Sequence, residues 1–504
     1  MLKCVIEELL MPITHIINLS LIQGRVPDDL KIAKVIPIFK SGDKSKFNNY
    51  RPISLLPIIS KILERIIYNR ITHFIEQNNY FYKHQYGFRK GHSTIHPIIH
   101  FLNYLHNAKE NRPSKLTVGL FLDLSKAFDT ISHEILLSKL NIIGIRGKTN
   151  DLIRDYLTNR KQYTEITGKT SSITPITCGV PQGSILGPLL FLLYINDIQN
   201  IPIESEILSF ADDTTLFITG KNIQNLQNKA NMESKHLYEW LCANKLSLNV
   251  SKTKYILFGA TKNQSLNFNI KINNQNIEQI SDNNPTKSIK FLGVHIDEKL
   301  TWKYHINLVN KKIANATFAI NNVKNFIPKR ILKMLYQTLV QPHLTYNILC
   351  WGNPNNAHIK KTFTLQKRAI RTINNAKYND HTEPLFKRNK LLKLNDLFTA
   401  ESIRFLIKLE NNKLPRSFDG VLILNRVIHP GRVTRQNNLY SVKLARTKLT
   451  KNLPSCCLPK IWNKWKAKIP KTINKHFLKL VTIAIMDEYQ YNIHCDNNFC
   501  LQCR

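Results

Sequence analysis

Two neighbouring carboxylates, Asp212 and Asp213, are the residues of this chain best suited to do chemistry. They stand between two apolar, β-prone runs, 208–211 and 214–217, so the pattern predicts a tight hairpin with both acids at its tip. Adjacent buried carboxylates repel each other unless a divalent cation binds between them. Hard cations such as Mg²⁺ favour oxygen ligands of this kind, whereas the structural alternative is an acidic surface turn.

A third carboxylate, Asp123, stands at the end of a predicted strand. Apolar residues alternate along 118–122 before it, and a helix over 134–140 is expected to begin after an N-cap at Ser132. A carboxylate at a strand end, beside a carboxylate hairpin on a neighbouring strand, makes a three-acid site of the kind that holds two metal ions for phosphoryl transfer. Asp129 is either a fourth ligand or a residue that sets the following turn.

A set of motifs surrounds these acids in a fixed order along the chain. They are Lys40-Ser-Gly-Asp43 with Asn49-Tyr-Arg-Pro-Ile-Ser-Leu-Leu56, Gln85-Tyr-Gly-Phe-Arg89 with Gly91-His-Ser-Thr94, the Phe121-to-Asp129 segment, Gly179-Val-Pro-Gln-Gly-Ser-Ile-Leu-Gly-Pro188, Phe210-Ala-Asp-Asp213, Leu248-Asn-Val-Ser-Lys-Thr253 and Phe291-Leu-Gly293. With these motifs the chain resembles the reverse transcriptases of non-LTR retrotransposons, close to the jockey-like group. The resemblance is strong over roughly residues 30 to 300 and looser elsewhere.

The resemblance implies an α+β, right-hand polymerase fold with a basic C-terminal region. It places the fingers at 1–110, the palm with an antiparallel sheet and the catalytic site at 111–300, and a helical thumb at 301–410. Residues 411–504 form the basic region of uncertain fold. The implied activity is that of an RNA-directed DNA polymerase, whose partners are an RNA template, a DNA primer and deoxynucleoside triphosphates.

The resemblance also implies the metal chemistry. Asp123, Asp212 and Asp213, with the carbonyl of Leu124, would hold two Mg²⁺ ions. One ion would lower the pKa of the primer 3′ hydroxyl, and the other would bind the triphosphate and stabilise the leaving pyrophosphate.

Basic residues complete the implied site. Lys40 and Arg51 would hold the incoming triphosphate, because Arg presents a fork suited to phosphate oxygens and Lys a compact point charge. Lys252 matches the segment of the family's proposed general acid for pyrophosphate. Nearby Lys254 is its possible substitute, and plain surface charges are the alternative for all of these side chains.

Three further residues are implied to contact the nucleotide. Phe128 would lie against the sugar and exclude a 2′ hydroxyl, with core packing as the alternative. Gln182 and Gly183 would lie near the new base pair, with a structural turn as the alternative. The segment around Phe291-Leu-Gly293 looks like the hairpin that grips the primer end, and Asp297 after it is either part of that hairpin or an ordinary turn residue.

The charge of the chain favours a nucleic-acid partner. Lys and Arg number 72 against 34 acids, which gives a formal net charge of +38 and predicts strongly salt-dependent binding to phosphate backbones. A coding bias toward A and T would also enrich Lys, Asn and Ile, but it would not remove Asp and Glu. The alternative functions are a non-catalytic nucleic-acid-binding protein derived from such an element and a two-metal nuclease.

Other sequence features indicate where in the cell the protein is expected. An opening helix over 5–21 is expected to break near Pro12, and the longest apolar stretch, 185–195, is too short to span a bilayer and is predicted to be a buried helix. The N-terminus lacks the pattern of a signal peptide, and the nine cysteines show no disulfide framework. We therefore expect an intracellular protein of nucleus and cytoplasm without a membrane partner, and the sequence indicates no oligomeric state.

The C-terminal half is expected to be mostly helical up to residue 410. A helix over 360–373 is predicted to turn Lys367, Arg368 and Arg371 outward, where they would lie along a duplex. Trp462 and Trp465 are expected to be core residues, with base stacking as the alternative. His494, Cys495, Cys500 and Cys503 resemble zinc ligands without a standard spacing. Relatives usually carry an endonuclease before the polymerase, for which this chain has no length, so we expect a fragment, a gene-prediction product or a decayed copy.

Overall fold

The computed structural model of the chain gives a folded arrangement for most of the sequence. The described residues are 5–110, 114–261, 268–282, 287–355, 357–419, 422–428, 438–442, 445, 451–468 and 477–487. The four Cys and His residues considered as zinc ligands, at positions 494, 495, 500 and 503, lie outside the described residues.

A five-stranded sheet carries the three acids. Its strands, in spatial order, are β14 (Glu278–Ile280), β11 (Lys254–Phe258), β3 (Leu116–Leu122), β9 (Asp213–Gly220) and β8 (Glu206–Phe210). All neighbouring strands are antiparallel except β11 and β14. The antiparallel palm sheet predicted from the sequence is thus confirmed, with one parallel pair at its edge.

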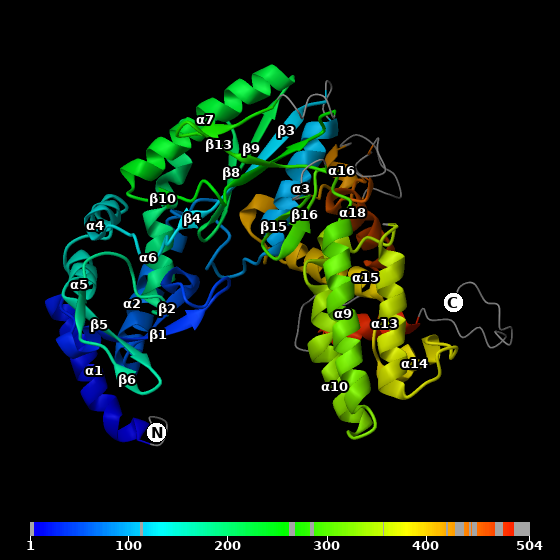
Figure 1. Ribbon diagram of the computed structural model, residues 1–504, viewed down its shortest axis with the longest axis horizontal. Helices are drawn as coiled ribbons and strands as arrows, with labels where there is room; N and C mark the ends of the chain where they lie inside the picture. The colour runs from blue at the N-terminus through cyan, green and yellow to red at the C-terminus, as the bar shows by residue number, and fades with distance from the viewer. Residues whose placement is uncertain are drawn as a thin grey trace.

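Helices cover both faces of this sheet. Since successive side chains of a strand point to opposite faces, the side chains on both faces are buried. On one face Phe101 of α3 (Ile95–Glu110) stacks on Phe217 with 4.7 Å between the ring centroids. The other face packs against α7 (Ile223–Ala243), the long helix that runs over the sheet in Figure 1. Burial on both faces explains why β3 is an almost continuous apolar run.

A second sheet lies toward the N-terminal end of the fold. Its strands are β2 (Tyr50–Leu55), β1 (Ile32–Phe39), β5 (Arg160–Ile166) and β6 (Lys169–Thr170), with β7 (Thr174–Ile176) also paired to β5. The helices of this part are α1 (Ile6–Gln23), α2 (Ile58–Gln77), α4 (His133–Ile142), α5 (Lys148–Leu157) and α6 (Leu186–Tyr194). The almost fully buried α6 is the helix predicted from the apolar stretch 185–195.

Two local predictions in this region need correction. The helix α1 continues through Pro12, so the predicted break is wrong. Proline removes one backbone hydrogen bond, but Ile13 and Ile17 are buried on one face of α1, and this packing holds the helix together past the proline. Ser132 does occupy the N-cap position of α4, yet its side chain makes no capping hydrogen bond.

The chain after the sheet is helical, as predicted. The helices are α9 (Lys303–Val323), α10 (Lys329–Leu339), α11 (Gln341–Thr345), α12 (Ile348–Trp351), α13 (Ile359–Asn374), α14 (Glu383–Asn389), α15 (Leu394–Glu410), α16 (Asn425–Ile428), α18 (Pro454–Trp465) and α19 (Phe477–Asp487). The predicted core positions of Trp462 and Trp465 are confirmed, since both side chains are buried. Lys367 is also buried, with its amine 4.7 Å from the centre of the Phe363 ring, so its predicted outward position is wrong.

Short elements complete the structure. The two-stranded pairs are β4 (Leu124–Ser125) with β10 (Ser247–Leu248), β12 (Lys271–Ile272) with β13 (Gln275–Asn276), and β15 (Ile289–Phe291) with β16 (Val294–Ile296). The 3-10 turns are η2 (Asp28–Lys31), η3 (Phe47–Asn49), η4 (Asn196–Asn200) and η5 (Arg416–Phe418). Asp297 is a turn residue, because its carboxylate accepts backbone hydrogen bonds from Lys299, Thr301 and Trp302 just before α9.

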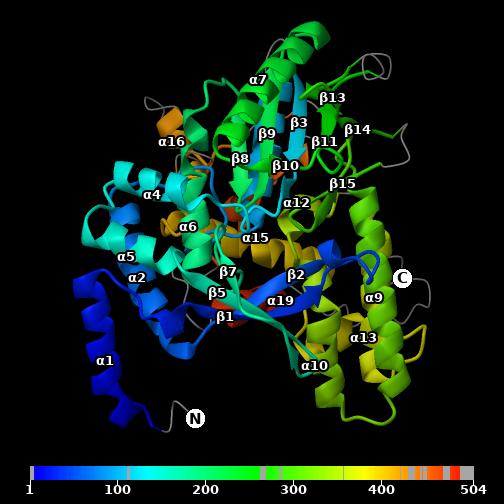
Figure 2. The same ribbon diagram turned by 60° about the vertical axis from the view of Figure 1, so that its left-hand side comes forward.

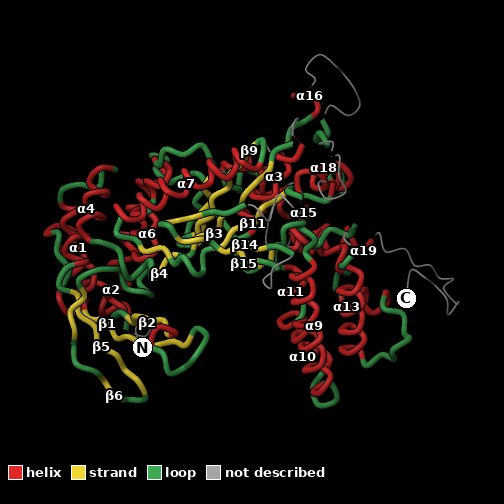
Figure 3. Tube along the Cα trace, turned by 45° about the horizontal axis from the view of Figure 1, so that its top comes forward, coloured by secondary structure: helices red, strands yellow, loops and turns green. Residues whose placement is uncertain are grey.

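The overall shape is an arch. In Figure 1 the β1–β2 sheet and α1 form one arm, α9, α10 and α13 form the other, and the β3–β9 sheet joins them at the top. Figure 3 shows the same two arms from another direction, with the strands of the central sheet between them, whereas the arms overlap in the view of Figure 2. Within the described part of the chain, no helix combines the length and the apolar character that a bilayer crossing requires.

Candidate active site

The Asp212 and Asp213 pair lies at the tip of the β8–β9 hairpin, as predicted. Phe210 pairs with Asp213, which leaves Ala211 and Asp212 as a two-residue turn. Ala211 has a φ of +57°, a left-handed conformation that non-glycine residues adopt mainly in tight turns of this kind. The turn therefore fixes the direction of both carboxylates through the backbone.

Asp123 lies beside this hairpin. The β3–β9 register pairs Leu122 with Thr214, so the next position along the two strands brings Asp123 opposite Asp213. The three carboxylates interact electrostatically, since Asp123 raises the pKa of both Asp212 and Asp213. Their carboxylate oxygens are not all within 4.8 Å of one another. Among the described residues, the group whose three ligand atoms meet that distance is His84, His100 and Glu206.

The segment predicted from Leu248 to Thr253 holds Asp123 in place. The amide of Asn249 donates to the carbonyl of Asp123 at 2.8 Å, and the amide of Asp123 donates to the Thr253 hydroxyl at 3.3 Å. Because antiparallel hydrogen bonds alternate, the carbonyl of Leu124, which is paired with Leu248, points away from β10. It is thereby free of the β-ladder, as a metal ligand must be.

The acids are poised to bind a cation. The pKa of Asp213 is raised to about 6 by burial, then by repulsion from Asp212 and Asp123. The pKa of Asp212 is raised chiefly by burial, with Asp123 adding to it. The Asp213 side chain is still open to solvent, so water screens part of this effect. A divalent cation would relieve the repulsion among the three carboxylates. Because all of their donor atoms are oxygens, the residues fit such an ion.

Lys40 and Arg51 face the acids from the β1–β2 hairpin. Arg51 pairs with Ile38, and the amide of Lys40 donates to the carbonyl of Asn49, so Lys40 and Arg51 lie on the same face of the hairpin. Both cations lower the pKa of Asp212, and both side chains are exposed. The structure thus brings the two predicted phosphate-binding residues to the acids.

A third basic side chain near the acids, Lys290, was not predicted from the sequence. It stands on β15, one residue before the Phe291-Leu-Gly293 motif, and it lowers the pKa of Asp213. The sequence does show a lysine inside the hairpin that is expected to grip the primer, which is a sign that Lys290 lies near the substrate. Its distance from the acids depends on how that hairpin docks, which no local pattern reveals.

Phe128 packs against two aromatic rings and stays half-exposed. Its ring stacks on Phe191 of α6 with 4.6 Å between centroids, and Phe88 meets it edge-on at 6.2 Å. The amide of Val180 donates to the carbonyl of Phe128 at 2.9 Å and fixes the backbone. The side chain remains half-exposed, so packing and a sugar contact are compatible in this position.

Gln182 and Gly183 make structural contacts as well as lying near the site. The Gln182 side-chain amide donates to the Asp129 carboxylate at 2.8 Å. The backbone carbonyl of Gln182 accepts a hydrogen bond from the backbone amide of Ser54 at 2.7 Å. Gly183 has a φ of +115°, and a Cβ there would lie 2.7 Å from the Ser54 carbonyl oxygen. The backbone at Gly183 therefore packs closely on β2, the strand that carries Arg51. Asp129 serves as the partner of Gln182.

Lys252 lies on the turn between β10 and β11. Its side chain is exposed, and its backbone amide donates to Asn249. The alternative, Lys254, forms an ion pair with Glu278 at 2.9 Å at the edge of the sheet. Of the two lysines, Lys252 is the one that keeps an exposed side chain for a ligand.

The loop before α3 supports the β8–β9 hairpin, a contact that the local sequence pattern does not predict. The side-chain oxygen of the buried Gln85 accepts hydrogen bonds from the amides of Gly87, at 2.8 Å, and Ala211, at 3.0 Å. Ser209 on β8 accepts from the amide of Tyr86 at 2.8 Å. The only sequence signal was the Gln85-to-Arg89 motif itself, since Gln85 and Ala211 are 126 positions apart.

The raised pKa of Asp213 predicts a pH dependence of metal binding. A carboxyl whose pKa rises from 3.8 to about 6 stabilises the metal-free fold at low pH, and this contribution is lost as the pH rises through that window. Since a cation binds the ionised form, we expect Mg²⁺ binding at pH 6 to release protons and to be weaker than at pH 8. Calorimetry in buffers of different ionisation enthalpy measures the release, which Asp213→Asn should remove. Equal affinity and no proton release at both pH values would contradict the prediction.

Comparison with known proteins gives one family match and several relatives. The family model described as "Reverse transcriptase (RNA-dependent DNA polymerase)" matches residues 40–296. The RNA-directed DNA polymerase from mobile element jockey of Drosophila melanogaster is 28% identical over 437 residues, which cover 83% of this chain and 46% of that protein. The probable RNA-directed DNA polymerase from transposon X-element, also of Drosophila melanogaster, is 27% identical over 86% of this chain and 47% of its own.

The chain spans about half the length of these curated relatives. Among solved structures, apo telomerase from Candida Tropicalis matches with a TM-score of 0.41 and 10% identity, over 78% of this chain and 68% of that one. The matched family segment begins at Lys40 and ends at Ile296, so it contains all three acids together with Lys40, Arg51 and Lys290.

Proposed function

Since the chain belongs to the reverse transcriptase family, we propose that it is an RNA-directed DNA polymerase of a non-LTR retrotransposon. It would extend a DNA primer on an RNA template with deoxynucleoside triphosphates, in the nucleus and cytoplasm. The observation that carries the proposal is the meeting of Asp123, Asp212 and Asp213 with Lys40 and Arg51 across two separate hairpins. The fold is the α+β right-hand type, and we assign fingers, palm, thumb and basic region to the residue ranges predicted above.

Members of this family use divalent metal ions, and we propose that two Mg²⁺ ions bind here. The three carboxylates and the carbonyl of Leu124 would hold them. Bound there, they would supply Lewis-acid activation of the primer hydroxyl and neutralise charge on the triphosphate.

The residues around the acids bind and orient the substrate. Lys40 and Arg51 would contact triphosphate oxygens, and Phe128 would set the position of the sugar against Phe191. Gln182, held by Asp129, and Gly183, packed on β2, would fix the position of the nucleotide relative to Arg51. Lys252 would donate a proton to the leaving pyrophosphate from its exposed position.

The experiment that tests this function is DNA-primed extension on an RNA template with Mg²⁺, using purified full-length chain. Template-dependent extension supports the polymerase. Tight, salt-sensitive binding of primer and template without extension would point instead to a non-catalytic binding protein, and cleavage of the strand to a nuclease.

Arg51→Ala is expected to raise the KM for deoxynucleoside triphosphates by about tenfold or more, because hydrogen bonds to charged groups contribute about 1.5–3 kcal/mol. Lys40→Ala should act in the same direction with a smaller change, since Lys lacks the bidentate fork. Steady-state extension kinetics measure both. Lys46→Ala, an exposed lysine of the same hairpin loop, is the matched control and should leave KM unchanged. An unchanged KM in Arg51→Ala refutes the phosphate role.

Phe128→Ala is expected to increase the use of ribonucleotides relative to deoxynucleotides by at least about tenfold, since it opens space beside the sugar. Primer extension with each nucleotide class measures the ratio of kcat/KM values. The control is Phe326→Ala, whose side chain is 85% exposed on another part of the chain. Loss of thermal stability with an unchanged ratio would mean that Phe128 only packs on Phe191.

A further inference from the structure

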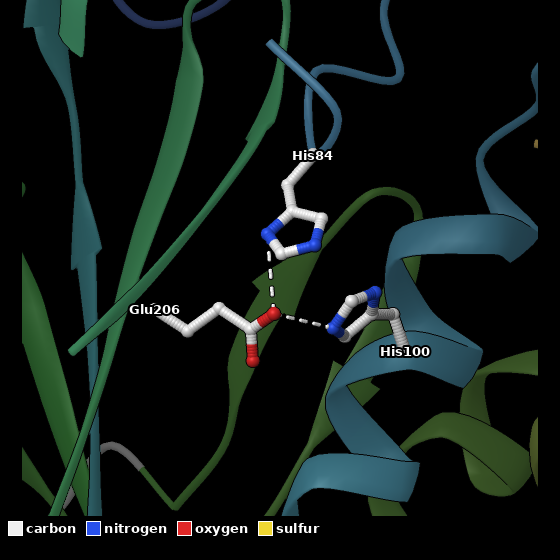
Figure 4. A group of neighbouring side chains, drawn as sticks. All are labelled: His84, His100 and Glu206. Atoms are coloured by element: carbon white, nitrogen blue, oxygen red, sulfur yellow. Dashed lines mark hydrogen bonds and ion pairs between the residues drawn. The ribbon is translucent and has the colours of Figure 1, made fainter. Parts of the chain in front are cut away.

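Two histidines and a glutamate converge behind the catalytic hairpin. His84 lies in the loop between α2 and α3, His100 on α3, and Glu206 at the start of β8. Figure 4 shows the imidazole rings of His84, from a loop, and His100, from a helix, both directed at the Glu206 carboxylate. Because β8 continues into the turn that carries Asp212, this cluster joins the α2–α3 loop and α3 to the base of that hairpin.

The geometry of the cluster suits a small metal ion. His84 Nδ1 lies 3.1 Å and His100 Nε2 lies 2.8 Å from Glu206 Oε1, and the three ligand atoms all lie within 4.8 Å of one another. Tetrahedral zinc with ligand distances of about 2.0–2.1 Å separates its ligands by about 3.3 Å, so only small side-chain shifts are needed. Two imidazoles and one carboxylate are a donor set that zinc favours over Mg²⁺.

Each ring nitrogen of His100 has a polar partner. Tyr86 Oη lies 2.8 Å from His100 Nδ1 and 2.9 Å from Ser417 Oγ, so Nε2 is the ring nitrogen that faces Glu206 Oε1. A polar partner on the far ring nitrogen is the arrangement that orients metal-binding histidines. A proton between Nε2 and Oε1 satisfies their 2.8 Å contact, and a bound cation would replace it.

The side chains are largely withdrawn from water. Exposure is 7% for His84, 15% for His100 and 25% for Glu206. The pKa of His84 is lowered to about 4, first by burial and then by His100, so His84 is neutral at pH 7. Burial alone would raise the pKa of Glu206. The hydrogen bond with His100 and the electrostatic attraction of His100 and His84 outweigh burial, so the pKa of Glu206 lies below its ordinary value.

We propose that His84, His100 and Glu206 form a structural zinc site that fastens the α2–α3 loop and α3 to β8, with water as a fourth ligand. The segments it joins already meet through backbone hydrogen bonds, from Ser209 to the carbonyl of His84 and from Tyr86 to the carbonyl of Ser209. The ion would stiffen the base of the hairpin and act at a distance from the chemistry. The assignment does not depend on the proposed polymerase activity.

Metal binding to the purified, chelator-stripped full-length chain tests the site. The chain should carry Cys495→Ser, Cys500→Ser and Cys503→Ser, so that the C-terminal thiolates do not contribute. Titration with Co²⁺ should give visible d–d absorption that saturates at about one ion per chain and is displaced by Zn²⁺, without thiolate charge-transfer bands. Zinc should also raise the melting temperature by several degrees.

Matched variants assign the signal to these residues. His100→Ala should abolish the absorption and the thermal shift, and Glu206→Gln, which keeps the size of the side chain, should weaken Co²⁺ affinity at least tenfold. His73→Ala, an exposed histidine of α2, and Asp212→Asn at the acid site should retain both signals. The proposal is overturned if the cysteine-substituted chain shows no saturable binding, or if His100→Ala and Glu206→Gln bind as well as their parent.

Discussion

Asp212→Asn is expected to lower the rate of primer extension by about three orders of magnitude or more. The substitution keeps the two-residue turn but removes one of the charges that would hold the metal ions. Metal ions contribute several kcal/mol of charge stabilisation, and each ~1.4 kcal/mol changes the rate about tenfold. Single-turnover extension on an RNA template measures the loss independently of substrate binding.

The matched control for this variant is Asp29→Asn. Asp29 is an exposed aspartate in η2, distant in sequence from the motifs, and its replacement should leave the rate unchanged. Because asparagine relieves the repulsion among the three acids, the metal-free Asp212→Asn protein should be at least as stable as the wild type. Extension at the wild-type rate by this variant would rule out the assignment of Asp212 as a metal ligand.

Gly87→Ala is expected to reduce extension by about a hundredfold while the chain stays folded. A Cβ at position 87 would lie 2.2 Å from the amide nitrogen of Ala211 and 2.9 Å from two further backbone atoms of the catalytic hairpin. Backbone atoms cannot rotate away as a side chain can, so the hairpin must shift. A displacement of about 1 Å at reacting groups typically costs about a hundredfold in rate.

The measurement is kcat together with circular dichroism of the same preparations. Gly168→Ala is the control, since a Cβ there meets nothing within 4 Å, although its φ of +81° makes the substitution mildly strained. We expect Gly168→Ala to lose some stability and no activity. Gln85→Ala should resemble Gly87→Ala in direction, because it removes the acceptor shared by Gly87 and Ala211. Full activity in Gly87→Ala would show that the loop does not fix the hairpin.

Much of the local structure could be predicted from the sequence. The hairpin at Asp212, the strand before Asp123, the buried helix in the stretch 185–195 and the helical C-terminal half follow from hydrophobic periodicity and turn residues, which act between near neighbours. Where a local rule failed, packing had overridden it. Lys367 was expected on the outer face of α13 but is buried, with its amine over the ring of Phe363 one helical turn earlier.

The sequence by itself determined that three acids would stand on a strand end and a neighbouring hairpin, and that basic residues would accompany them. Only the tertiary structure decided what meets these groups. Gln85 reaches Ala211, Gln182 reaches Asp129, Gly183 packs on Ser54 and Lys290 approaches Asp213. These contacts join segments far apart in the chain, and they are selected by burial and backbone fit across the whole core, which the spacing of neighbouring residues does not encode.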